Sequence, residues 1–192
     1  MTQKIWNERL LCNETIQMTG TRRLNGTLNG AAAVDAGGGF VDIAITNHGL
    51  TAGCYIQIAG SVAYNGVHRI VSAPDANTIR IQFTYVAEVF AGTETYRLCF
   101  QPYDDFELLE TRVKLSDVSA AENLVYLLDA NAGAAFDATL DTQAMNGLTE
   151  DIVIWRDATK RRFFEKGDVI AFTYANTNNR TWGLTLVARM RA

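Results

Sequence analysis

Four carboxylates near the middle of the chain have the type and spacing that acid–base chemistry requires. They are Asp104, Asp105, Glu107 and Glu110. Glycoside hydrolysis needs two such groups placed across the scissile bond. If a strand begins at Phe106, however, Glu107 lies on the opposite face from Phe106 and Glu110, and the carboxylates diverge. The pattern therefore favours a solvated junction between domains, with a glycan-cleaving enzyme that uses Glu107 or Glu110 as an alternative.

A second group of oxygen-bearing side chains could hold a calcium ion in a loop. It comprises Asp129, Asn131, Asp137 and Asp141. Their spacing departs from the DxDxDG pattern of calcium loops, and Asp and Asn are common turn residues. We therefore expect turns here, and no bound metal or cofactor.

The histidines, cysteines and serines form no recognisable zinc-binding or catalytic motif. His48 falls in an expected turn and His68 in an expected strand, and neither has a Cys or His at zinc-ligand spacing. No GxSxG motif is present. Cys12, Cys54 and Cys99 are widely spaced without a CxxC pair, which predicts buried thiols. We predict that the protein is not an enzyme.

Arginines and large aromatic residues are the best candidates for a subunit interface. Lys160, Arg161 and Arg162 precede two phenylalanines, and Arg22 and Arg23 form a smaller basic pair. Trp, Tyr and Arg concentrate binding energy at protein interfaces, although the aromatic residues could equally lie in the core. The candidate interface residues are Trp6, Arg22, Arg23, Tyr103, Trp155, Arg161 and Arg162.

Charge and composition restrict the class of partner. The chain of 192 residues has a net charge of −4 and an isoelectric point near 5.2, which argues against a broad basic face for nucleic acid. No apolar run is long enough to span a bilayer, and the N-terminus lacks the apolar core of a signal peptide. We therefore expect assembly in a cytoplasm with protein partners, and no membrane or sequence-specific nucleic-acid contact.

Short strands separated by turns fill residues 43–83. They are expected at residues 43–45, 55–58, 67–71 and 78–83. Asn65-Gly66 carries the strongest hairpin signal, because both residues tolerate positive φ. Residues 86–90 and 93–100 add a further hairpin. The stretch predicts a small β-barrel or sandwich.

The second half of the chain has its own series of strands. They are expected at residues 106–115, 124–128, 151–155, 168–174 and 181–187. Turn residues separate them, which predicts an antiparallel, jelly-roll-like β-sandwich. Residues 117–122 and 134–140 hold at most a turn of helix each, so the protein is expected to be all-β.

Pro102 lies where the pattern changes and predicts a domain boundary. We expect an N-terminal arm over residues 1–27, a small β-domain over 28–101 and a β-sandwich domain over 102–192. The arm mixes a helical period with strand-like alternation over residues 14–19. If residues 14–19 pair with strands beyond Phe106, the small domain is an insertion in the sandwich. The glycine-rich residues 20–39 are typical of a linker or of tight hairpins.

The order of turns in residues 47–79 resembles a small β-domain of tailed-bacteriophage structural proteins. The matching pieces are Asn47-His48-Gly49-Leu50, Ile56-Gln57-Ile58-Ala59-Gly60, Tyr64-Asn65-Gly66-Val67 and Asp75-Ala76-Asn77-Thr78-Ile79. That domain shows an HGL turn, an IxG strand end, a YNG turn and a DxNT hairpin. Cys54-Tyr55 and Ile79 depart from its usual residues. Residues 124–133 and 167–176 also resemble β-sandwich modules of phage virion proteins, more loosely.

The resemblance implies a non-enzymatic structural component of a bacteriophage particle. Within that class we expect a head-decoration or tail-associated protein that assembles in the bacterial host cytoplasm and resides in the virion. Its partners would be other virion proteins and further copies of itself, as a trimer or hexamer. The alternative is a carbohydrate- or host-receptor-binding module of a phage tail or fibre, with Trp155 or Trp182 stacked on sugar rings.

Overall fold

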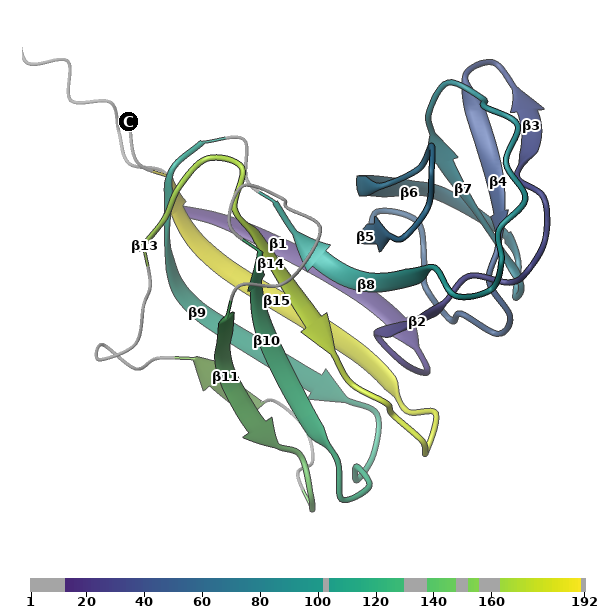
Figure 1. Cartoon of the computed structure of the whole chain (residues 1–192). Helices are drawn as coiled ribbons and strands as arrows, with labels where there is room; N and C mark the ends of the chain where they lie inside the picture. Colours follow the sequence, from purple (N-terminus) through teal and green to yellow (C-terminus); the bar gives the residue numbers. More distant parts are fainter. Residues whose placement is uncertain (1–12, 102–103, 130–137, 148–151, 156–162, 191–192) are drawn as a thin grey trace, which may run out of the picture.

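The computed structural model describes residues 13–101, 104–129, 138–147, 152–155 and 163–190, with only the backbone described for 13–14, 152–155 and 190. Within these ranges the chain is built of antiparallel β-strands and contains no helix, so none of them forms a membrane-spanning helix. The prediction of an all-β protein with a β-sandwich is confirmed. The strands form two open sheets, so the small β-domain expected over residues 28–101 is not a closed barrel (Figure 1).

The first sheet joins the two ends of the described chain. Its strands are β1 (Asn13–Thr21), β15 (Thr181–Met190), β9 (Phe106–Leu115), β12 (Ile152–Trp155) and β13 (Phe163–Phe164). Their order is β1-β15-β9-β12, and β13 also pairs with β9. β1 pairs with β15 from Asn13↔Arg189 to Thr21↔Thr181. The strand-like alternation of residues 14–19 therefore prevails over the helical period.

The second sheet runs through both halves of the molecule, in the order β11-β10-β14-β8-β5-β6-β7-β4-β3 with β2 also on β8. Its first strands are β2 (Asn25–Thr27), β3 (Val34–Gly37), β4 (Phe40–Ala44), β5 (Tyr55–Ala59) and β6 (Gly66–Asp75). The others are β7 (Thr78–Gln82), β8 (Thr95–Phe100), β10 (Asn123–Asp129), β11 (Ala138–Ala144) and β14 (Val169–Thr173). We call β3–β7 the small unit, and the first sheet with β10, β11 and β14 the sandwich.

β8 belongs to both halves of the molecule. Along one edge, Thr95 to Leu98 pair with β5 of the small unit. Along the opposite edge, Thr95 to Arg97 pair with β2, and Leu98 to Phe100 pair with β14 of the sandwich. The chain thus leaves the sandwich after β1, builds the small unit and returns through β8 to β9 (Figure 1).

Period-two alternation explains which faces are buried. In β15 the even positions Trp182, Leu184, Leu186 and Ala188 are buried, whereas Gly183, Thr185 and Val187 are less so. The two sheets of the sandwich meet through aromatic rings, such as Phe100 of β8 against Phe106 of β9, whose centroids lie 5.3 Å apart. In the small unit, β4 and β7 bury their isoleucines in the same way.

Several local predictions are wrong in detail. Residues 86–90 do not form a hairpin strand; Val89 instead makes an isolated bridge with Ala32. β5 and β6 do form a hairpin, but residues 60–65 connect them, so Asn65-Gly66 is not a two-residue turn. Asn65 spans that loop, since its Oδ1 accepts from the Ser61 N–H at 2.9 Å.

Other differences concern β11 and the short helices. A turn of helix was expected within residues 134–140; residues 138–140 instead begin β11, which pairs with β10 and has a bulge beside Tyr126, and residues 134–137 lie outside the described ranges. Residues 117–122 are likewise not helical. Both segments have few large apolar residues, so their local sequence pattern does not specify a secondary structure. In β11 it is pairing with the edge of β10 that selects the strand conformation.

The HGL turn holds the small unit against the sandwich. Thr21 N–H donates to the Gly49 carbonyl at 2.7 Å, and Leu50 bridges to Gly20. A Cβ on Gly49 would lie 2.1 Å from the Thr21 carbonyl oxygen, and one on Gly20 would lie 2.6 Å from the Gly49 oxygen. The backbones can meet this closely only because both residues are glycine.

Gly49→Ala should therefore lower the free energy of unfolding by at least about 3 kcal/mol, because left-handed backbone strain of about 1–2 kcal/mol is joined by a clash with the Thr21 backbone. Gly53→Ala is the matched control, since Gly53 also has positive φ (90°) but has nothing within 4 Å of an added Cβ. It should cost only the strain. Urea denaturation monitored by tryptophan fluorescence measures both, and equal losses would contradict the close-contact explanation.

Candidate functional site

The structure places only part of the expected interface. Arg22 is half-buried and Arg23 exposed in the link between β1 and β2. Trp155 ends β12, but its side chain is outside the described part of the chain. The remaining candidates also lie outside the described residues; they are Trp6, Tyr103, Arg161 and Arg162. The aromatic part of the expected interface is therefore not tested.

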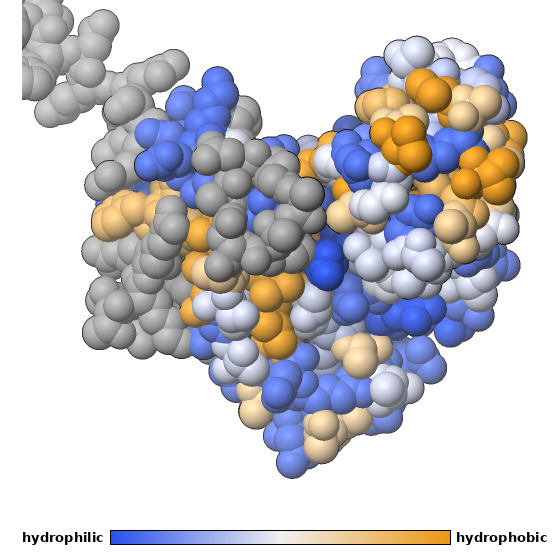
Figure 2. All heavy atoms as spheres, in the orientation of Figure 1, coloured by the Kyte–Doolittle hydropathy of each residue, from blue (hydrophilic) through white to orange (hydrophobic). Residues whose placement is uncertain are grey.

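Four exposed valines lie in or directly after the small unit, at positions where no contact surface was expected. Val62, Val89, Val34 and Val86 are 93, 74, 56 and 45% exposed. We call these four residues the valine surface. Several hydrophobic residues are visible on this half of the molecule (Figure 2). Their positions follow no helical or strand periodicity in the sequence, because they come from loops and an edge strand.

Glu88 brings the valine surface together. Its carboxylate accepts from the Val62 and Ala63 N–H groups at 2.8 and 2.9 Å and from the Ser61 hydroxyl at 2.9 and 3.0 Å. Val86 and Val89 flank Glu88 in the chain, and the Val86 carbonyl accepts from the Tyr64 hydroxyl at 2.6 Å. Because the carboxylate has its hydrogen bonds within the chain, a partner can cover it without leaving it unpaired.

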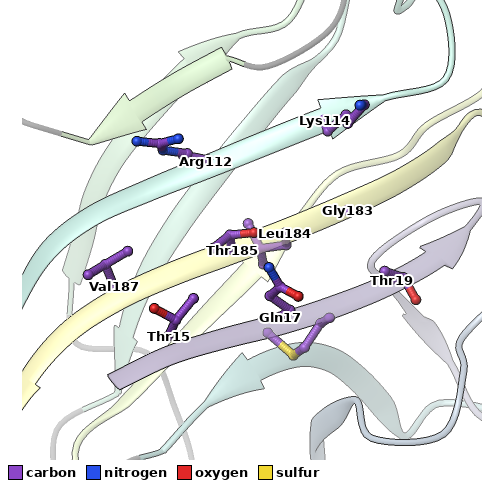
Figure 3. Close-up of a pocket in the computed structure, with 10 residues that line it drawn as sticks. Thr15, Gln17, Thr19, Arg112, Lys114, Gly183, Leu184, Thr185 and Val187 are labelled. Atoms are coloured by element: carbon purple, nitrogen blue, oxygen red, sulfur yellow. The ribbon is translucent and has the colours of Figure 1, made fainter. Parts of the chain in front are cut away.

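A shallow hollow of about 500 Å³ lies on the outer face of the first sheet (Figure 3). Gly183 stands in register between Thr19 and Lys114, and an added Cβ there would meet nothing within 4 Å. The missing side chain therefore opens the hollow. Its lining mixes polar side chains with Met18, Leu184 and Val187, and Arg112 in it is ion-paired with Glu110. Such an open, mixed face suits a broad contact better than an enclosed ligand.

Two of the four carboxylates at the start of β9, Glu107 and Glu110, are ion-paired. β9 does begin at Phe106, but a bulge opposite Val187 and Ala188 adds Leu109 to the strand. The extra residue shifts the alternation, so Glu107 and Glu110 lie on the same outer face and do not diverge as expected.

Each of these glutamates pairs with an arginine. Glu107 is 7% exposed and faces Arg189 at 3.5 Å, and Glu110 faces Arg112. A fully solvated cluster is therefore wrong at Glu107. The neighbouring Asp105 accepts from the Lys166 N–H at 2.8 Å, which ties the start of β9 to the turn before β14.

His48 is a structural turn residue, as expected. Its ring is 2% exposed, and its Nδ1 accepts from the Leu50 N–H at 2.9 Å. Its Nε2 lies 3.2 Å from the carbonyls of Asp75 and Thr78, so Nε2 carries the proton. The ring thus links the HGL turn to the β6–β7 hairpin, and its nitrogens are engaged.

Two cysteines and part of the candidate calcium ligands can be placed in the described part of the chain. Cys54 and Cys99 are free and buried, and burial raises the pKa of both thiols; Cys12 lies outside the described residues. Among the described residues, no three His, Cys, Asp or Glu side chains gather as a metal site. Asp129 is buried against the Gln57 amide, while Asn131 and Asp137 are outside the described ranges.

Trp182 is not available as a platform for sugar rings. It is 2% exposed, and its Nε1–H donates to the Arg22 carbonyl at 3.1 Å. The expectation that this residue could stack on a glycan is therefore wrong. The physical reason is its place on the inward face of β15, with its ring against Gly20.

Comparison with family models, curated proteins and solved structures found no match for the chain. The likeness of residues 47–79 to a phage β-domain stays a prediction. Function is therefore inferred from the residues of this chain alone.

His68 should make stability depend on pH. Its Nε2–H donates to the Tyr64 carbonyl at 2.9 Å, and burial lowers the pKa of its ring below the ordinary histidine value of 6.5. The unfolded chain therefore binds a proton on His68 more readily than the folded protein does. The contribution of His68 to the free energy of unfolding is complete above the pKa of the unfolded state. It is lost as the pH falls from there toward the pKa of the folded state, by up to about 1.4 kcal/mol per pH unit.

Urea denaturation at pH 7.5, 6.5 and 5.5 should show this loss for the unaltered chain and a smaller loss for His68→Gln. The variant at pH 7.5 gives the pH-independent loss of free energy of unfolding that comes from replacing the ring. In the unaltered protein that ring makes an edge-to-face contact with Phe83 at a centroid distance of 5.3 Å. Identical pH slopes for the two proteins would show that His68 does not carry the dependence.

Proposed function

We propose that this protein is a non-enzymatic structural component of a bacteriophage particle, of the head-decoration or tail-associated kind, that acts by symmetric assembly of its own copies with other virion proteins. The valine surface is the observation that carries the proposal. A monomer gains nothing from exposing several large apolar side chains around a carboxylate that already has its hydrogen bonds. A second copy of the chain is the occupant that closed symmetry supplies.

The rigid connection of the two halves supports the same proposal. The shared strand β8 and the HGL turn fix the small unit on the sandwich, so a contact made by one half positions the other. Closed symmetry then multiplies modest contacts into a stable assembly. The ordered turns of residues 47–79, which resemble a phage virion domain, point to the same class.

Native mass spectrometry and light scattering should show a trimer or hexamer. Replacing two valines with aspartate, Val62→Asp with Val89→Asp, should raise the dissociation constant at least about 100-fold. Each valine removes roughly 1.5 kcal/mol or more of apolar burial, and each 1.4 kcal/mol is tenfold in affinity.

Val118→Asp is the matched control, because Val118 is 41% exposed but lies on the sandwich. It should leave the oligomer intact. A strict monomer for the unaltered chain would overturn the proposal, and equal weakening by Val118→Asp would remove the valine surface from it.

A further inference from the structure

A pocket of about 240 Å³ lies where the small unit meets the sandwich. Three segments line it: the β1–β2 link, the turn after β4, and the loop between β14 and β15. The lining residues are Arg22, Arg23, Thr46, Asn47, Ala175, Asn176, Thr177 and Asn179. We call it the junction pocket. At about 30 Å³ per water it has room for roughly eight waters, or one sugar-sized unit.

Unusual backbone converges on the junction pocket. Arg22, Asn47, Asn176 and Asn179 have φ of 67, 51, 47 and 51°, and they are the only non-glycine residues with positive φ in the described ranges. Asparagine adopts this conformation readily, but arginine does so rarely and at a cost of about 1–2 kcal/mol. Strain of this kind persists where the surroundings hold the residue in place, and it gathers at binding sites.

Two side chains hold Arg22 in that conformation. The Asn176 amide donates to the Arg22 carbonyl at 2.6 Å and to the Arg180 carbonyl at 2.7 Å. The indole Nε1–H of Trp182 donates to the same Arg22 carbonyl at 3.1 Å. Asn176 and Trp182 are both buried, so the Arg22 backbone is anchored from inside while its side chain is left for the pocket.

The charge in the junction pocket is uncompensated within the described residues. Arg80, Arg112, Arg180 and Arg189 each form an ion pair, whereas Arg22 and Arg23 form none with any residue that the structure describes. Arg23 lies beside the Tyr96 hydroxyl, where its charge partly offsets the rise in the pKa of that tyrosine on burial. Glu122 is the nearby carboxylate, and it accepts from the Thr177 N–H at 3.0 Å.

The polar side chains of the pocket divide into engaged and available groups. The Thr46 hydroxyl donates to Asn29 at 3.0 Å, and the Thr177 hydroxyl donates to Glu122. The amides of Asn47 and Asn179 are exposed and make no side-chain hydrogen bond with the rest of the described chain. The Arg22 guanidinium, the Arg23 donors that do not face Tyr96 and two amides therefore remain to meet a ligand.

We propose that the junction pocket binds a small polar molecule that carries a carboxylate or a phosphate. Arg22 and Arg23 hold the oxyanion, because the planar guanidinium fork matches its geometry, and Asn47 and Asn179 bond to hydroxyl groups beside it. Since the lining comes from both halves of the molecule, a bound ligand stabilises the folded junction. This inference does not depend on the assembly proposed above.

Calorimetry on the full chain tests the proposal with glucuronate, inorganic phosphate and glucose as probes. Glucuronate or phosphate should bind saturably at millimolar concentrations and raise the melting temperature, and added sodium chloride should weaken the binding. Glucose, which matches glucuronate without the charge, should bind at least tenfold more weakly. The anion that binds more tightly shows whether the natural ligand carries a carboxylate or a phosphate.

Charge-removing variants locate the binding. Arg22→Asn, which keeps a residue that tolerates positive φ, and Arg23→Gln should each weaken binding of the anion at least tenfold. Arg69→Gln removes an exposed arginine from β6 and should have no effect. If Arg22→Asn fails to fold, Arg23→Gln decides. No saturable binding of either anion, equal binding of glucose, or equal loss on Arg69→Gln would overturn the proposal.

Discussion

The close approach of Gly49 to Gly20 and Thr21 is the contact on which the arrangement of the two halves depends. A hydrogen bond of 2.7 Å joins the backbones there, and no side chain larger than hydrogen fits on Gly49. His48 positions the same turn from the other side, through its bonds to Leu50 and to the β6–β7 hairpin. The HGL sequence therefore holds the small unit against the sandwich, and its histidine has a structural role.

The two halves are also joined rigidly by β8, because this strand continues the sheet from one half into the other. The corner formed by Arg22, Asn176 and Trp182 lies beside this contact and uses buried hydrogen bonds to hold a strained backbone. The junction thus holds the two halves together and brings into one pocket Arg22 and Arg23, which form no ion pair with a described residue. The valine surface, by contrast, lies in and directly after the small unit, with its four side chains exposed.

Much of the fold follows from local pattern. Alternation over β7, β9 and β15 placed those strands, and the turn residues between them excluded long helices. Prediction failed where a neighbouring strand, rather than the segment itself, supplies the specificity. β11 needs the edge of β10, and Val89 forms a bridge where a hairpin strand was expected. At β9 a single extra residue, Leu109, placed Glu110 on the same outer face as Glu107.

The sequence by itself determined the all-β class, the positions of most long strands and the structural role of His48, because alternation and turn chemistry act over a few residues. The tertiary structure alone decided that β8 is shared, that Trp182 is buried, and that Arg22, Asn47 and Asn179 line one pocket. Each of these features depends on residues that are far apart in the chain. They arise from backbone pairing and close packing, which cannot be read from the local periodicity of side chains.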